Sequence, residues 1–319
     1  MKIVVLALNP AIDNEWKVNS MLVEEKNTIL ASRYWAGGKG INVCRWLKKF
    51  EIDPVLVLPL GGNTGRELKK CIKSEGIRFK GIKIAGCTRT NYLISADNGR
   101  QMRFNEVGPE LSKSDFRNII DTLNGLIGKG DYLVLSGSLP KGINYNAYAE
   151  IIKAFKKTEI RVFLDCDGKA FKEATKEKPF LVKPNLFELG QWAGHQMESR
   201  GEVVKTALAL SYWTWGWVAV SMGPEGAILV NAHKKMAFEG TTPKVRVCNR
   251  LGAGDAMLAG IVSSVVRDED PEQWLKLGIT TGTASTLVPG GELPKSALFK
   301  KISRFVKITR IQITGNEEG

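Results

Sequence analysis

Residues 251–255 read Leu-Gly-Ala-Gly-Asp and stand directly before an apolar run at 256–262. Glycines permit close backbone approach to a ligand, and the free N–H groups at the start of a helix attract anions such as phosphate. Asp255 is itself an anion, so its position suggests a group that takes a proton from a nucleophile. The same spacing also fits an aspartate that only stabilises the start of a helix.

A second glycine cluster lies far upstream, where residues 36–43 read Ala-Gly-Gly-Lys-Gly-Ile-Asn-Val and lead into another helical pattern. Two loops suited to anions in one chain indicate two ligands. Neither loop has the GxxxxGK[ST] spacing of a Walker A motif or the GxGxxG spacing of a dinucleotide site. Both common nucleotide-binding motifs are therefore excluded as explanations.

The composition is typical of a large α/β core, with 319 residues of which 43% are hydrophobic. The sequence lacks a run of 18 apolar residues, and Pro10 interrupts the apolar N-terminus early, so we expect a cytoplasmic protein without a membrane partner. Five cysteines without a CxxC pair suit reduced thiols. Two histidines offer little material for a zinc site or for Ser-His-Asp chemistry.

The formal net charge of +13 indicates a protein whose field attracts anions. Nucleic acids and phosphorylated metabolites are the two candidate classes. Nucleic-acid-binding proteins usually concentrate Lys and Arg in one stripe, whereas here these residues are spread along the chain. We therefore expect small phosphorylated molecules as partners and no nucleic acid.

Short apolar runs bounded by glycine, proline or aspartate alternate with longer stretches of helical spacing. The apolar runs, typical of buried parallel strands, lie at 4–8, 55–58, 132–136, 162–165, 180–183 and 217–221. The helical stretches lie at 41–50, 65–75, 114–127, 145–155 and 202–211. This alternation predicts an α/β fold with a doubly wound, mostly parallel sheet and helices on both faces. Ligands of such a sheet bind beyond the carboxyl ends of its strands.

Two regions, at about 13–35 and 81–105, instead alternate polar and apolar residues of β-branched or aromatic character. They predict antiparallel strands outside the main sheet, paired as a small β-strand lid over one end of it. With no repeat or linker in the sequence, we expect residues 1–319 to form a single domain that includes the lid. Exposed strand edges and apolar lid residues predict a homodimer formed through the lid. These apolar residues are Trp16, Ile29, Leu30, Tyr34 and Trp35.

Further motifs follow one another along the chain. They read Leu-Asn-Pro-Ala-Ile-Asp at 8–13, Thr-Arg-Thr-Asn at 88–91, Ser-Gly-Ser-Leu-Pro at 136–140, Lys-Pro-Asn-Leu-Phe-Glu at 183–188 and Val-Ser-Met-Gly-Pro-Glu-Gly at 220–226. Together with the two glycine loops, they resemble the ribokinase-like sugar kinases of the phosphofructokinase-B family over essentially the whole chain. The first two motifs are most similar to the branch that acts on sugars already carrying a phosphate.

The resemblance implies roles for the residues of the loop at 251–255. Asp255 is expected to accept the proton of the sugar hydroxyl that attacks the γ-phosphorus of ATP, as a catalytic base. The amides of Gly252, Ala253 and Gly254 are expected to stabilise the transferring phosphoryl group. Because a helix start favours the ionised carboxylate, we expect Asp255 to be a weak base in the ground state.

The acceptor's hydroxyls and its phosphate need separate partners. The resemblance places them among Asp13, Lys26, Gly37, Gly38, Lys39, Asn42, Arg89, Asn91, Arg103 and Ser138. Arg89 is the best candidate for the phosphate, because a guanidinium can grip phosphate with two hydrogen bonds. Lys26 and Arg103 fit equally well as solvated charges of the lid.

ATP and a hydrated Mg²⁺ ion are the cofactors that the resemblance implies. The nucleotide is expected to contact Lys183, Asn185, Ser221, Gly223, Gly226, Gly282 and Ser285. Asn185 and Glu188 are expected to organise the Mg²⁺ ion. Without the other motifs, Glu188 would be better explained as an ordinary acid in the first turn of a helix.

The leading functional expectation is phosphorylation of fructose 1-phosphate to fructose 1,6-bisphosphate. The same chemistry on tagatose 6-phosphate or fructose 6-phosphate stays open, because all three acceptors offer a free hydroxyl and a distal phosphate. A hypothesis of another class is a non-catalytic phosphometabolite sensor or a nucleic-acid-binding protein on a kinase fold. An intact Asp255 favours catalysis, since a pure binder of phosphates has no need of an acid beside them.

Overall fold

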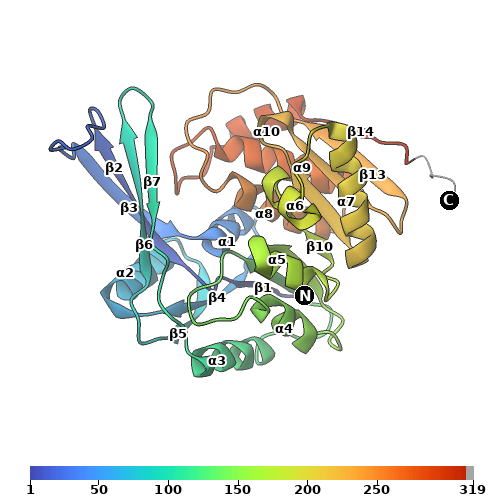
Figure 1. The fold of residues 1–319 in the computed structure, drawn as a ribbon, viewed down its shortest axis with the longest axis horizontal. Helices are drawn as coiled ribbons and strands as arrows, with labels where there is room; N and C mark the ends of the chain where they lie inside the picture. The colour runs from blue at the N-terminus through green and yellow to red at the C-terminus, as the bar shows by residue number, and fades with distance from the viewer. Residues whose placement is uncertain (314–319) are drawn as a thin grey trace.

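A computed structural model describes residues 1–313 and shows one large sheet flanked by helices, with a smaller sheet extending away from it (Figure 1). The strands of the large sheet run in the order β14-β13-β12-β11-β10-β9-β8-β1-β4-β5. Their bounds are β1 Ile3–Leu6, β4 Val55–Leu60, β5 Arg78–Lys83, β8 Tyr132–Ser136, β9 Arg161–Asp165, β10 Leu181–Val182, β11 Trp217–Ser221, β12 Ala227–Asn231, β13 Met236–Thr241 and β14 Lys307–Arg310. The helices are α1 Lys39–Lys49, α2 Gly62–Ser74, α3 Lys113–Asn124, α4 Ala147–Ala154, α5 Gly168–Thr175, α6 Leu186–Ala193, α7 Arg200–Thr214, α8 Ala253–Val266, α9 Pro271–Ser285 and α10 Ser296–Phe305.

Most of the large sheet is parallel. Every neighbouring pair from β11 through β10, β9, β8, β1 and β4 to β5 is parallel, and β12, β13 and β14 continue the sheet in antiparallel pairs. Helices cover both faces (Figure 1). The predicted α/β fold with a doubly wound, mostly parallel sheet is therefore confirmed.

The central strand β1 shows why its sequence is apolar at every position. Val5 packs in a core cluster with α8 side chains such as Leu258, and it is fully buried. Its neighbours Val4 and Leu6 point to the opposite face and pack in a second cluster with α3 side chains such as Ile119. Because each face of the sheet has its own core, a strand in the middle has no solvated side.

The small sheet has the strand order β3-β2-β6-β7, with β2 at Ala11–Val18, β3 at Ala31–Gly37, β6 at Arg89–Ala96 and β7 at Gln101–Asn105. The expectation that all these strands are antiparallel is wrong for one pair, because β2 and β6 run parallel from Ala11–Arg89 to Val18–Ala96. Strand β2 follows β1 and β6 follows β5, and those two strands point the same way. The chain therefore leaves the large sheet twice in the same direction.

The region expected to begin the second part of the lid, at residue 81, begins within the large sheet. Residues 81–83 are the end of β5, which pairs in parallel with β4. Phe79 and Ile82 are partly buried against the two core clusters, and this packing holds the segment in the main sheet. The small sheet itself takes up the chain again at Arg89.

Helix α8 is buried almost all round, since Asp255 and every residue from there to Val265 is buried. A helix that is apolar on all sides belongs in a core. Glycines let it approach α9 closely: a Cβ atom at Gly260 would lie 2.6 Å from the hydroxyl of Thr281. The role of α8 is to hold its first turn against the sheet.

Residues 1–313 include no helix with the length and apolarity needed to cross a bilayer.

Two glycines at the 3₁₀ turn Gly223–Glu225 after β11 give a matched pair of stability predictions: Gly223 begins the turn and Gly226 follows it. Gly226 has φ +96° and a Cβ atom there would lie 1.9 Å from the carbonyl oxygen of Gly240, whereas Gly223 has φ +59° and open space around it. We expect Gly226→Ala to lower the free energy of unfolding by about 3 kcal/mol. Gly223→Ala should cost about 1 kcal/mol. Urea denaturation of both variants checks this, and equal losses would contradict it.

Candidate active site

A cleft of about 1110 Å³ opens beyond the carboxyl ends of the parallel strands, where the topology places ligand sites. Its walls come from strand ends, from the small sheet and from the first turns of α1 and α8. Most sequence candidates line it, namely Asp13, Gly38, Lys39, Asn42, Arg89, Asn91, Arg103, Ser138, Lys183, Asn185, Glu188, Ser221, Gly223, Gly226, Gly252, Ala253, Gly254, Asp255 and Gly282. Residues 200 positions apart in sequence thus meet in one cavity.

Three sequence candidates do not line the cleft. Lys26 is exposed in the connection between β2 and β3. Gly37 is buried behind Asp13, where a Cβ atom would overlap the Asp13 carboxylate. Ser285 lines a smaller cavity, and its hydroxyl donates to the carbonyl of Gly282. These positions differ from the expectation because a motif does not specify which side of a strand, helix or loop faces a ligand.

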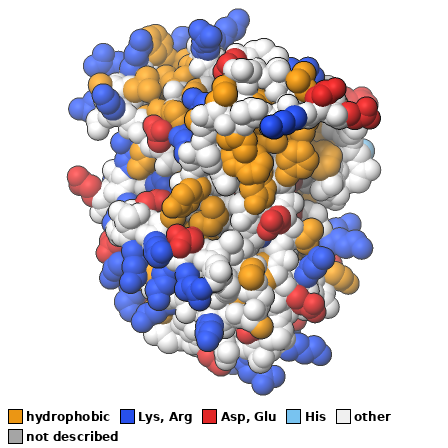
Figure 2. Space-filling view, turned by 90° about the vertical axis from the view of Figure 1, so that its left-hand side faces the viewer, with side chains coloured by type: hydrophobic (Ala, Val, Ile, Leu, Met, Phe, Trp, Pro, Cys, Tyr) orange, Lys and Arg blue, Asp and Glu red, His pale blue; other side chains and the backbone are white. Residues whose placement is uncertain are grey.

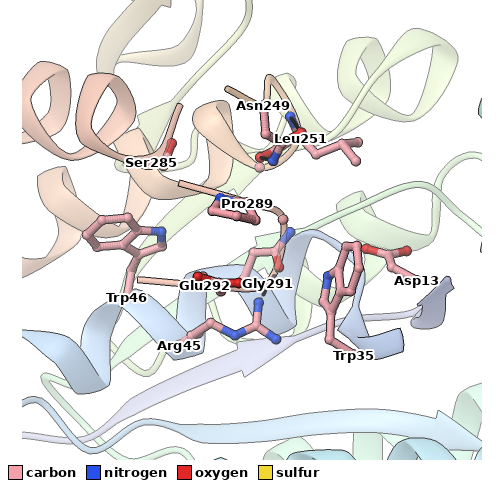
Figure 3. A pocket seen from close by; sticks show the side chains of 13 residues that line it. Asp13, Trp35, Arg45, Trp46, Asn249, Leu251, Ser285, Pro289, Gly291 and Glu292 are labelled. Carbon is pink, nitrogen blue, oxygen red and sulfur yellow. Dashed lines mark hydrogen bonds between the residues drawn. The ribbon is translucent and has the colours of Figure 1, made fainter. Parts of the chain in front are cut away.

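The smaller cavity, of about 30 Å³, lies behind the glycine loop at 252 (Figure 3). That volume has room for about one water molecule. It is lined by the indole of Trp35 from β3, by Pro289 and Gly290, and by Asn249. The Asn249 side chain bonds both the N–H and the carbonyl of Leu251, which closes the turn just before the loop. The cavity therefore backs onto the wall of the main cleft.

The first turn of α8 presents free backbone N–H groups to the cleft. Gly252 is the residue before the helix, with φ +75°, and no side chain caps this end. Such N–H groups, with the positive end of the helix dipole, attract phosphate. Asp255 is 5% exposed, and its Oδ2 accepts a hydrogen bond from Asn42 Nδ2 at 2.8 Å. Its side chain is thus held by α1 rather than by its own helix.

A second buried carboxylate lies between two lysines. Asp165, at the end of β9, is 1% exposed, and its oxygens lie 3.1 Å from Lys39 Nζ and 3.3 Å from Lys183 Nζ. Burial acts to raise the pKa of Asp165, yet the ammonium groups of Lys183 and Lys39 hold it below the ordinary value. Asp165 is therefore a fixed negative charge.

Asp255 has the opposite shift. Burial raises the pKa of Asp255 and the nearby Asp165 carboxylate adds to this, while Lys39, Asn42 and Lys183 act to lower it. The sequence predicted that Asp255 would be a weak base because a helix start lowers the pKa of a carboxylate. That prediction is wrong, because burial outweighs the helix dipole and raises the pKa. When the pKa values of two neighbouring carboxyl groups are shifted in opposite directions, one group usually takes part in proton transfer and the other stays ionised as a fixed charge. Of the pair, Asp255 has the raised pKa and lies at the start of α8, and Asp165 has the lowered pKa.

The other end of the cleft is cationic. Arg89 donates from Nη1 to the carbonyl of Glu106 and from Nη2 to that of Asn9, both at 3.0 Å, and its buried Nε has no partner among residues 1–313. Each Nη keeps a second N–H for a ligand. Burial lowers the pKa of Arg103, and so does the facing guanidinium of Arg250. These groups make a site suited to an anion.

Polar side chains lie between the two ends. Asn91 Nδ2 donates to Asp13 Oδ1 at 2.8 Å, and Asn9 Nδ2 donates to the hydroxyl of Ser138 at 3.2 Å. Burial raises the pKa of Asp13. Carboxylate, amide and hydroxyl groups in this arrangement suit a molecule with several hydroxyls.

Asn185 and Glu188 form a capping box at the start of α6. Glu188 N–H donates to Asn185 Oδ1 and Asn185 N–H donates to Glu188 Oε2, both at 2.8 Å. Glu188 therefore has the structural role that an ordinary first-turn acid would have. Its second oxygen remains available, and Glu188 also lines the cleft. Burial raises its pKa.

These residues fit a Mg²⁺ ion only as part of its ligand shell. Oxygen is the ligand that Mg²⁺ prefers, and the ion usually keeps several waters and takes substrate phosphates as ligands. Within residues 1–313 no group of three Asp, Glu, His or Cys side chains could enclose a metal. The donor set is therefore compatible with an ion held mainly by water and nucleotide phosphates.

Sequence reasoning missed Asp165 and also Arg45, whose guanidinium donates a hydrogen bond to Asn42 beside Asp255. Asp165 directly follows the apolar run at 162–164, so its position after a strand was a usable signal. Arg45 lies in a predicted helix with no motif around it, and only its contacts in the structure mark it.

The cleft combines a helix start suited to phosphate, a buried carboxylate with a raised pKa, and a polar end suited to a molecule with several hydroxyls. This combination is typical of a phosphotransferase. Residues 8–297 match the family model of pfkB family carbohydrate kinases, and the chain belongs to this family. Its co-substrate is therefore ATP.

Curated relatives match nearly the whole chain. The 1-phosphofructokinase of Bacillus subtilis is 32% identical over 96% of this chain and 99% of its own length. The tagatose-6-phosphate kinase of Staphylococcus epidermidis is 31% identical over 86% of this chain and 88% of its own.

Solved structures show the same fold. The phosphofructokinase-2 of Escherichia coli in complex with fructose-6-phosphate superimposes with a TM-score of 0.89 at 28% identity, over 95% of this chain and 98% of that one. A tetrameric inhibited form of the same enzyme is also similar, with a TM-score of 0.89.

Proposed function

We propose that this protein transfers the γ-phosphoryl group of ATP to a sugar that already carries a phosphate, with fructose 1-phosphate as the acceptor and fructose 1,6-bisphosphate as the product. The observation that carries the proposal is a buried Asp255 beside a free helix start, at one end of a cleft whose other end holds Arg89 and Arg103. The names of the relatives support the choice of a phosphosugar over a plain sugar.

In this proposal Asp255 accepts the proton of the attacking hydroxyl, and its raised pKa improves it as a base at neutral pH. The amides of Gly252, Ala253 and Gly254 donate to the oxygens of the phosphoryl group in transit. Lys39, in the first turn of α1, balances negative charge near Asp255 and Asp165. Orientation of the hydroxyl against the phosphorus supplies a further part of the rate enhancement.

The acceptor's hydroxyls bind Asp13, Asn42 and Ser138 with the backbone at Gly38, and Asn91 holds Asp13 in place. The acceptor's phosphate binds the free donors of Arg89, together with Arg103. Arg103 reaches the cleft from β7, the outermost strand of the small sheet. Closure of that sheet over the acceptor brings both guanidinium groups to one phosphate.

The nucleotide occupies the opposite rim, formed by Lys183, Ser221, Gly223, Gly226 and Gly282. A Mg²⁺ ion neutralises the nucleotide phosphates when bound, with Glu188 and Asn185 holding its waters. Lys183 keeps Asp165 ionised in this region and faces the phosphates with its remaining N–H donors.

We also propose a homodimer formed through the small sheet. Hydrophobic side chains gather on this side of the molecule (Figure 2), and Tyr34, Leu30 and Phe104 are each more than half exposed. Trp16 and Trp35, which the sequence placed on the same surface, are only half-exposed: Trp16 lies 5.0 Å from Tyr92 of the neighbouring strand between ring centroids, and Trp35 lies against glycines 290 and 291.

A coupled ADP-release assay over a panel of acceptors tests the activity. We expect the highest kcat/KM with fructose 1-phosphate, in keeping with the relatives named 1-phosphofructokinase, and lower values with tagatose 6-phosphate and fructose 6-phosphate. Sugars without a phosphate should give far lower values, because the distal phosphate must reach Arg89 while a hydroxyl reaches Asp255. Turnover of ribose or adenosine without turnover of any phosphosugar would contradict the proposal. A DNA complex at physiological salt with no turnover at all favours the binding role instead.

A further inference from the structure

A buried chain of hydrogen bonds leads from the end of α2 to Asp255. Arg45 on α1 is 7% exposed, and its Nε and Nη2 donate to the two carboxylate oxygens of Glu75 at 2.7 and 2.8 Å. Nη2 also donates to the carbonyl of Ala36. Nη1 donates to Oδ1 of Asn42 at 2.7 Å, one turn earlier on the same helix. The guanidinium is thus fixed in its plane.

This contact settles which way the Asn42 amide points. A guanidinium only donates, so the amide oxygen must face Arg45. The amide nitrogen then faces the opposite side, where it donates to Asp255 Oδ2 at 2.8 Å. An ionised carboxylate only accepts, so both neighbours of Asn42 require the same orientation. With Oδ2 occupied, Oδ1 of Asp255 is the oxygen left for the acceptor hydroxyl.

We propose that Arg45, held by Glu75, is a positioning residue that orients the Asn42 amide and through it the carboxylate of Asp255. The inference rests on the proposed role of Asp255 as base. Arg45 lies in the wall of the small cavity behind the glycine loop (Figure 3), so it acts without touching either substrate.

We call the hydrogen bonds that lead from Glu75 through Arg45 and Asn42 to Asp255 the relay. Loss of the relay has two physical consequences. The Asp255 carboxylate becomes free to rotate away from the hydroxyl, which lowers kcat. The hydrogen bond from Asn42 also acts to lower the pKa of Asp255, so its loss raises that pKa further. The other charged groups that face Asp255 are Lys39 of α1, Lys183 after β10, Asp165 of β9 and Asp13 of β2. Of these, only Asp13 is acted on by the charge of Arg45, which lowers its pKa.

The experiment removes both charges of the relay at once. Arg45→Met combined with Glu75→Leu leaves no unpaired buried charge, whereas Arg45→Met alone would strand Glu75. We expect kcat of this double variant to fall about 30-fold, with KM for ATP changed less than about twofold. The acid limb of the kcat–pH profile should move to higher pH. The charge of Arg45 also acts on Asp13, so KM for the acceptor is measured separately.

A mutant cycle separates positioning from a merely structural role. In an Asn42→Ala background, adding the two substitutions should lower kcat by less than about twofold, because the hydrogen bonds from Arg45 reach Asp255 only through Asn42. Arg267→Met is the matched control, since exposed Arg267 donates to the α1 end at the carbonyl of Phe50 and reaches no part of the site. It should leave kcat and the pH profile unchanged.

The outcomes are distinct. Unchanged kcat and pH profile in the double variant, or a full 30-fold loss in the Asn42→Ala background, overturns the inference. If Asp255→Asn stays active, it is the proposed role of Asp255 that fails. If the double variant does not fold, Arg45→Lys is used, because one ammonium cannot span Glu75, Ala36 and Asn42. The same upward shift of the acid limb is then expected, with a smaller loss of kcat.

Discussion

Asp255→Asn is expected to lower kcat by about 10³-fold, because an amide cannot take the proton of the acceptor hydroxyl. The amides of Gly252, Ala253 and Gly254 belong to the backbone and stay in place, so dissociation constants for ATP and the acceptor should change little. Single-turnover kinetics with calorimetric binding measurements check both parts. A parallel loss of affinity and rate would point to binding as the main role of this carboxylate.

The same variant carries a stability prediction with a definite sign. The pKa of Asp255 is raised in the folded protein, so the folded state binds its proton more tightly than the unfolded chain does. Stability is therefore lost as the pH rises from the unfolded pKa through the folded pKa, and the full cost is present above both pKa values. Asp255→Asn removes that cost.

We expect Asp255→Asn to melt at the same or a higher temperature than the parent protein at pH 7. Asp121→Asn, at an exposed position on α3, is the matched control and should change neither Tm nor kcat. An inactive Asp255→Asn protein with a clearly lower Tm would mean that the carboxylate supports the fold, and the catalytic assignment would then need another residue.

Arg89→Met is expected to lower kcat/KM for fructose 1-phosphate by about 10²-fold, because charge-assisted hydrogen bonds to phosphate are lost in a partly buried site. KM for ATP should stay the same, since Arg89 lies at the other end of the cleft from Lys183. The loss of the bonds to Asn9 and Glu106 also lowers the free energy of unfolding by about 1 to 2 kcal/mol.

Unphosphorylated fructose separates phosphate recognition from a general effect on the small sheet. Its low kcat/KM should be nearly the same in the Arg89→Met variant, because fructose has no phosphate to lose contact with. Arg100→Met, in the exposed turn between β6 and β7, is the matched control. Equal losses with fructose and fructose 1-phosphate would show that Arg89 holds the sheet in place rather than the phosphate.

The sequence was sufficient for the architecture, because the signals that specify it are local. The apolar run at β1 fits a strand buried on both faces, and the glycines before α8 fit a helix start that binds anions. Motif order then indicated the family, and most of the site residues named from the motifs do line the cleft. Such features depend on neighbours within a few positions, and so they can be read without a fold.

The small sheet was predicted only in part. Alternating residues indicated strands away from the core, yet the parallel pairing of β2 with β6 joins Ala11 to Arg89. That register follows from the positions and the shared direction of β1 and β5, which lead directly into β2 and β6. Lys26 illustrates the same limit, since a lysine near the acceptor motifs lies outside the cleft.

By itself the sequence determined the sheet, the helices and the presence of a carboxylate at an anion-binding helix start. Only the tertiary structure decided how that carboxylate is held and charged. Asn42 and Asp255 are 213 residues apart, and Lys39 and Asp165 are 126 apart. Burial and charge act through space, so the pKa of Asp255 and its link to Arg45 arise only when the strands bring these distant residues together.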